Sequence, residues 1–199
     1  MIFNAEMVRA LLDGRKTQTR RPIKWKQTRF TEIGEREDGS KWPWSEDAKH
    51  ACDFWHPCPF GAVGDRIWVR EAFRVHSRAT DVATLVYKAS ERNSWTEQTR
   101  RVPVAVCNKP ATPEKWTPSL HMPRWASRIL LEITGVRVER LRSMSQDDAR
   151  AEGVIAASGP MEAGLAFREL WDSIYGEESW KANPWVWVIE FKRVEGGAA

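Results

Sequence analysis

The sequence predicts an α+β protein in which short helices flank a strongly twisted, mostly antiparallel sheet that can close into a small β-barrel. Three observations support this fold class. Several short runs are rich in β-branched and aromatic residues and end at turn residues. The helical patterns are short and lie far apart. Two long stretches, 24–62 and 90–125, show no sustained hydrophobic period, so we expect long loops or insertions there.

Each expected helix has residues that suit its ends. Asn4 can cap the first helix, and Gly14 is a favourable residue just after it. Ser145 and Asp148 match a capping box at the start of the second. The third is expected from its apolar spacing alone. These helices are expected over 4–13, 145–153 and 161–176.

The expected strands follow the β-rich runs. Residues 17–21 can be extended because Pro22 discourages a helical conformation at Arg21. Two further runs are expected on either side of Thr134 and Gly135. The strands are expected within 64–75, 83–89, 128–141 and 184–194. With 199 residues, the chain suits a single domain over 1–199, with a frayed tail at 195–199.

Positive charge is concentrated at the front of the chain. The net charge is +4, yet residues 1–30 hold eight Lys/Arg and only two acids. Seven of these basic residues lie between Arg15 and Arg29, which we call the basic segment. Such a segment attracts phosphate groups, although a charge run is more often a solvated surface. No apolar run is long enough for a membrane helix, and three scattered cysteines do not suggest a disulfide framework, so we expect a cytoplasmic protein with no membrane partner.

One short motif follows the first expected helix. Gly14, Lys16 and Arg21 form the pattern G-x-K-x-x-x-x-R, which resembles the signature of the ASCH domain family. The stretches "GDRIWVRE", "HMPRWASRILLEI", "ARAEG" and "WVWVIEFKRV" look most like ASCH-type proteins of bacteriophages and prophages. The resemblance implies a PUA-like β-barrel and a role with RNA or modified nucleosides. Some members of the family bind RNA, and one branch is reported to cleave it.

The resemblance also implies candidate catalytic residues. A small bacterial branch of the family is an N4-acetylcytidine amidohydrolase, with a lysine and a threonine spaced like Lys16 and Thr19 here. It also carries a glutamate on a later helix, which matches Glu152 of "ARAEG". Thr19 would be the nucleophile, Lys16 the base and Glu152 the orienting acid. This chain is much longer than that branch and adds tryptophan-rich loops, which leave the substrate open.

These residue types impose a physical condition. A threonine hydroxyl is a weak nucleophile unless a base removes its proton, and lysine is a base only when neutral. Burial and nearby arginines favour neutral Lys16, whereas an ion pair with Glu152 opposes it. On a flat strand Lys16 and Thr19 would face opposite ways, so the chain must turn between them.

Other residues are candidates for binding. Arg15, Arg20, Arg21 and Lys24 could contact phosphates, while Arg124 and Trp125 could flank a base. Trp125 could equally plug one end of a barrel. The alternatives to the amidohydrolase are therefore a non-catalytic RNA-binding module and a ribonuclease. We expect no cofactor, and the oligomeric state is open. The sequence offers one weak candidate zinc site, formed by His50, Cys52, His56 and Cys58.

Overall fold

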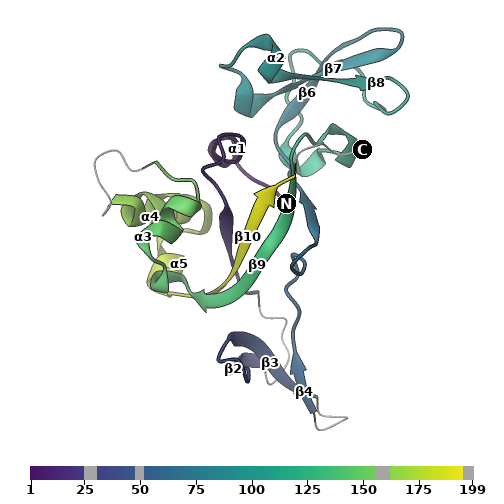
Figure 1. The fold of residues 1–199 in the computed structure, drawn as a ribbon. Coiled ribbons are helices and arrows are strands. Elements are labelled where there is room, and N and C mark those ends of the chain that lie inside the picture. The colour runs from purple at the N-terminus through teal and green to yellow at the C-terminus, as the bar shows by residue number, and fades with distance from the viewer. Residues whose placement is uncertain (25–30, 48–51, 156–161, 195–199) are drawn as a thin grey trace. The chain divides into compact units, whose positions relative to one another are not determined.

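The computed structural model describes residues 1–24, 31–47, 52–155 and 162–194. It confirms the mixed α+β class, with more strands than helices and a curled sheet that resembles half a barrel (Figure 1). The chain forms two compact units, each built from separate stretches. Unit 1 comprises 1–14, 66–132 and 193–199, and unit 2 comprises 15–65 and 133–192. The expectation of a single domain remains a prediction.

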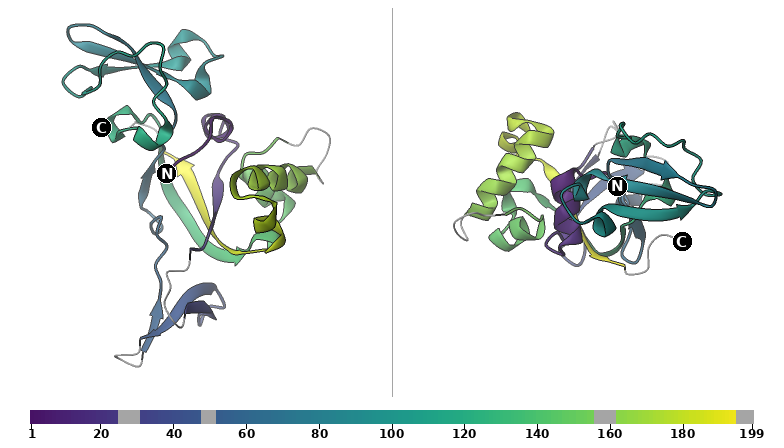
Figure 2. Two further views of the ribbon diagram at one scale, coloured as in Figure 1. Left: turned by 180° about the vertical axis from the view of Figure 1, so that it is seen from behind. Right: turned by 90° about the horizontal axis from the view of Figure 1, so that it is seen from above.

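The curled sheet of unit 2 is antiparallel. Strand β1 (Gln18–Pro22) pairs with β10 (Trp185–Arg193), so that Thr19 lies opposite Ile189. On its other side, β10 is bonded to β9 (Leu130–Arg140). The two long strands curve together, and three helices gather on one side of the curve in Figure 1 and in the left view of Figure 2. These are α3 (Gln146–Ala151), α4 (Glu162–Tyr175) and α5 (Glu177–Lys181).

Helix α4 packs on this sheet through aromatic residues. Phe167 and Trp171 are buried together with Val186 and Val188 of β10. The apolar spacing of this helix therefore predicted its buried face in part, because Leu165 is 61% exposed. Helix α3 begins with the expected capping box, in which the Ser145 hydroxyl accepts from the backbone N–H of Asp148.

The prediction of two runs around Gly135 was wrong, because β9 is one continuous strand. Gly135 does not bend the chain into a turn; it makes room for a side chain across the sheet. A Cβ at this position would lie 2.7 Å from a carboxylate oxygen of Glu190. A glycine inside a strand therefore marks a close approach here, which the sequence alone did not distinguish from a turn.

Of the long loops or insertions expected over 24–62, the described part is not a long loop, because it contains three strands. Strands β2 (Thr31–Glu35), β3 (Lys41–Asp47) and β4 (Cys52–Trp55) form a three-stranded antiparallel sheet. Tryptophans hold it together: Trp44 and Trp55 are cross-strand partners, and the Arg36 guanidinium lies 4.0 Å from the Trp42 ring centroid. Charged and aromatic residues alternate irregularly here, so no period of two was visible.

Unit 1 contains the first helix and a third antiparallel sheet. Helix α1 (Ala5–Leu12) is capped by Asn4, as expected. Strand β5 (Arg66–Trp68) pairs with the start of β9. The sheet of β6 (Phe73–Arg78), β7 (Val82–Tyr87) and β8 (Thr99–Pro103) follows the order β6–β7–β8. Helix α2 (Trp95–Gln98) precedes β8, so the prediction of a loop over 90–125 was wrong there. The described residues also contain four short 3-10 helices: Lys88–Ser90, Ser119–His121 and Arg124–Ala126 in unit 1, and Leu141–Ser143 in unit 2.

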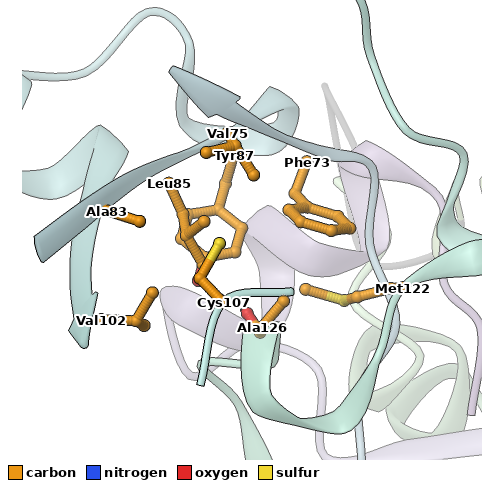
Figure 3. Close-up of a cluster of buried hydrophobic side chains, with 9 residues drawn as sticks. All are labelled: Phe73, Val75, Ala83, Leu85, Tyr87, Val102, Cys107, Met122 and Ala126. Atoms are coloured by element: carbon orange, nitrogen blue, oxygen red, sulfur yellow. Dashed lines mark hydrogen bonds between the residues drawn. The ribbon is translucent and has the colours of Figure 1, made fainter. Parts of the chain in front are cut away.

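The core of unit 1 lies on one face of its three-stranded sheet (Figure 3). Phe73 and Tyr87 are directly opposite each other on β6 and β7, and both are fully buried. The Tyr87 hydroxyl donates to the carbonyl of Ala126 at 2.7 Å, which satisfies its polar end. Arg128 forms an ion pair with Glu71 beside this cluster, donating to its two carboxylate oxygens at 2.8 and 3.0 Å.

Candidate functional site

Lys16 is the buried centre of the candidate site. Lys16 lies between Gly14 and β1. The backbone at position 14 has a φ of +73°, a left-handed conformation that favours glycine. Its side chain is fully buried, and its Nζ lies 2.8 Å from Glu152 Oε2 and 2.9 Å from the Glu152 carbonyl oxygen. Burial lowers the pKa of Lys16 despite the opposing effect of the Glu152 carboxylate. The amine is therefore both ion-paired and shifted toward its neutral form.

Glu152 also binds a second cation. Its Oε1 accepts from Arg20 at 3.2 Å, and the Arg20 side chain is fully buried. Arg20 reaches two more carboxylates, at 2.5 Å to Glu139 and 3.4 Å to Asp148. Burial raises the pKa of Asp148, but hydrogen bonds from Ser145 and Gln18 and the charge of Arg20 lower it overall. The site is thus a compact network of alternating charges.

The local backbone geometry explains this convergence. Gln18 and Arg20 lie on the same face of β1, and both bond to Asp148 of α3. On the helical side, Asp148 and Glu152 are four residues apart, so they project from one side of the turn. This repeated i, i+2 spacing of polar residues facing an i, i+4 acid pair was visible in the sequence. The site prediction missed Gln18, Asp148 and Glu139; the spacing includes Gln18 and Asp148, but it does not indicate which acids fold against β1.

Thr19 occupies a different position from the other two candidate residues. Alternation along β1 puts its side chain on the face opposite Gln18 and Arg20, and it is 2% exposed. The structure therefore brings Lys16 and Glu152 into direct contact and holds Thr19 three residues away in a regular strand. A shallow hollow of about 320 Å³ lies at the start of β1, where Thr17, Gln18, Asp148 and Glu190 line it.

The candidate binding residues are not all available. Arg20 is ion-paired with carboxylates, and Arg21 donates to the Tyr175 hydroxyl at 3.3 Å. Arg15 is exposed and donates to the Gly153 carbonyl at 2.7 Å, while Lys24 is exposed. Lys26 and Arg29 lie outside the described residues.

Arg124 and Trp125 belong to unit 1, whereas the Lys16 network belongs to unit 2. Trp125 packs edge-on against Phe73 with ring centroids 6.2 Å apart, and it borders the buried core. This contact favours the packing role that the sequence left open for Trp125. Arg124 is exposed beside it.

The positive charge concentrated in residues 1–30 does not make the unit that contains the basic segment positive. Unit 1 holds 14 Lys/Arg and 9 Asp/Glu, a net charge of +5. Unit 2 contains the basic segment, yet it holds 17 Lys/Arg and 18 Asp/Glu, a net charge of −1. Carboxylates from distant parts of the sequence therefore offset the basic segment.

Of the four candidate zinc residues, the structure describes Cys52, His56 and Cys58. His50 lies outside the described residues, Cys52 is exposed, and His56 Nε2 lies 2.9 Å from the Ser45 hydroxyl. Among the described residues, no group of three or more His, Cys, Asp or Glu side chains could hold a metal ion. Within the same residues, no helix has both the length and the apolar character needed to span a membrane.

Comparison of the chain with protein families, curated proteins and solved structures finds no match.

Proposed function

We propose that the chain is an ASCH-type protein with a PUA-like fold, and that it acts in the cytoplasm as an amidohydrolase on an acylated cytidine. The observation that carries this proposal is the fully buried Lys16 amine, held by Glu152, with its pKa lowered by burial. A lysine serves as a general base only in its neutral form, and burial favours that form. The curled sheet of β1, β10 and β9 supports the PUA-like assignment.

The proposed reaction uses the hydroxyl of Thr19 as the nucleophile. Neutral Lys16 takes the hydroxyl proton while the oxygen attacks the acyl carbon of the substrate amide. The carbon–nitrogen bond then breaks, and the proton passes to the leaving nitrogen, which releases cytidine. Water hydrolyses the acyl ester on Thr19 and releases the acid. Because Thr19 is 2% exposed, these reaction steps require a local opening around β1 when substrate binds.

Glu152 fits the role of a positioning residue. It holds the Lys16 amine through both its carboxylate and its backbone carbonyl, which leaves little rotational freedom. Arg20 shares the same carboxylate and so reduces the charge available to hold a proton on Lys16. Glu152 must orient the Lys16 amine and yet must not hold it in the protonated form. Because Arg20 shares the carboxylate, Glu152 can orient the amine without fully stabilising its protonated form.

The test is release of cytidine from N4-acetylcytidine by the purified protein. We expect turnover in the parent protein and a loss of at least about 100-fold in both Lys16→Met and Thr19→Val, since each removes one partner of a proton transfer. Thr80→Val is the matched control, because Thr80 is an exposed threonine of unit 1 outside the Lys16 network, and it should retain activity. Absence of turnover by the parent protein, or full activity in Thr19→Val, would contradict the proposal.

The same variants separate the alternative functions. Labelled RNA is incubated with the parent protein, Lys16→Met and Thr19→Val. Cleavage that survives in Thr19→Val but not in Lys16→Met indicates a ribonuclease, in which Lys16 stabilises phosphorane charge. Binding of RNA without any product indicates a non-catalytic module.

A further inference from the structure

The outward face of the unit 1 sheet carries a group of basic and aromatic residues. Alternation along β6 turns Arg74 away from the core that Phe73 and Val75 enter. A register shift between Val75 and Ser77 places Ser77 opposite Thr84, whose other neighbour across the sheet is Arg101 of β8. We call Arg74, His76, Thr84, Arg101 and the adjoining Trp95 and Trp116 the outer face.

Two tryptophans stand against the basic residues of this face. The Arg74 guanidinium lies 4.5 Å from the Trp116 ring centroid. The His76 ring packs edge-on against Trp95, with centroids 5.0 Å apart. Trp95 nevertheless remains 53% exposed, unlike the core tryptophan Trp171 at 2%. The Trp95 indole is thus fixed on one side and open on the other.

The position of Trp95 is set by its short helix. Ser94 and Glu97 form a capping box, and the Thr99 hydroxyl donates to the Trp95 carbonyl at 2.8 Å. Glu97, the acid on this helix, is therefore engaged with Ser94. An exposed aromatic ring on a constrained backbone loses little side-chain entropy on binding.

The charge of this part of the chain favours an anionic partner. Residues 66–132 hold twelve Lys/Arg and six Asp/Glu, a net charge of +6. Arg101 is exposed, and no acidic residue in the described part of the chain forms an ion pair with it. The exposed Arg101 guanidinium therefore offers donors to phosphate.

We propose that the outer face binds single-stranded nucleic acid, with one base stacked on Trp95 and the backbone phosphates contacting Arg101. Exposed aromatic rings beside arginines on a β-sheet accept unpaired bases, because every base presents a flat π surface. A duplex buries those surfaces and cannot stack in this way. The proposal uses different residues from the Lys16 network and holds whether or not the protein is a hydrolase.

The test measures fluorescence anisotropy of labelled oligouridine RNA, oligothymidine DNA and a DNA duplex, each titrated with the full chain. We expect both single strands to bind more tightly than the duplex, with affinity that falls steeply with salt. Trp95→Ala should weaken single-strand binding by about tenfold, within the range for loss of one stacked base. Arg101→Ala should reduce the slope of log affinity against log salt by about 0.7.

Two exposed residues provide matched controls. Phe54→Ala removes an aromatic ring that is 49% exposed, and Arg142→Ala removes an exposed arginine outside the outer face. Neither should change binding. Circular dichroism confirms folding of each variant, and Trp95→Phe, which keeps a smaller ring, should bind between the parent protein and Trp95→Ala.

Preference for duplex, no binding at low salt, or equal affinity in Trp95→Ala and the parent protein would each overturn the proposal. Tighter binding of RNA than of single-stranded DNA would indicate contacts with the ribose 2′-hydroxyl. Equal binding would show that the protein does not distinguish the two sugars. Either result supports the outer face, provided that Trp95→Ala weakens binding.

Discussion

Replacing Glu152 with alanine is expected to destabilise the protein by about 3–5 kcal/mol, the usual range when one partner of a buried ion pair is removed. Glu152 is 2% exposed and neutralises two cations whose side chains are fully buried. Without it, Lys16 loses its ion pair with Glu152, and among the described residues Arg20 keeps its contacts with Glu139 and Asp148. Urea denaturation, followed by far-ultraviolet circular dichroism, measures the loss.

Two further variants show that the loss comes from burial. Lys16→Met removes the buried cation and leaves Glu152 paired with Arg20, so it should cost clearly less than Glu152→Ala. Asp147→Ala removes a carboxylate that is 90% exposed and paired with Arg150, so it should change stability by no more than about 0.5 kcal/mol. Equal losses for Glu152→Ala and Asp147→Ala would show that the network contributes nothing beyond surface charge.

Phe73→Ala is expected to destabilise the protein by about 3–5 kcal/mol, as is typical for deleting a buried phenylalanine. Phe73 is 0% exposed and packs with Leu85, Tyr87 and the edge of Trp125. The short strands around it constrain how far the cavity can collapse. The readout is again the free energy of unfolding in urea, and an exposed apolar dye reports whether the core opens.

The same substitution elsewhere serves as the control for this prediction. Phe54→Ala deletes a ring that is 49% exposed, so its cost should be near 0.5 kcal/mol or less. If both phenylalanine variants lose the same free energy, then the cluster around Phe73 does not act as the core of unit 1.

Local patterns allowed a large part of the fold to be predicted. Asn4 and Ser145 cap helices as expected, because capping depends on residues close in sequence. The sheet of β2, β3 and β4 was missed because tryptophan pairs such as Trp44 and Trp55 stabilise it across strands. Such pairing depends on register, which the sequence of one strand does not reveal.

The candidate site was predictable to a similar degree. The contact between Lys16 and Glu152 is present, although its expectation came from a resemblance rather than from spacing. The roles of Arg20 and Asp148 were not foreseen, because a basic run gives no indication of which acids fold against it. Arg20, expected to bind phosphate, is instead buried among carboxylates that lie more than a hundred residues away in sequence.

The protonation of Lys16 determines whether it can act as a base. Its folded pKa is lowered, so between that value and 10.5 the unfolded chain binds more protons than the folded chain. The contribution of Lys16 to stability should therefore rise with pH over this window. The rate of any reaction that uses the neutral amine should rise with pH through the folded pKa.

The most direct measurement is the titration of the Lys16 side chain by nuclear magnetic resonance in the folded protein. Lysine Cε and Nζ shifts are followed with pH, and the Lys16→Met variant identifies the resonance of Lys16 by its absence. We predict a titration midpoint below the ordinary lysine value of 10.5, because burial outweighs the attraction of Glu152. A midpoint at or above 10.5 would contradict the account, since the Lys16–Glu152 contact would then be a structural ion pair with no accessible base.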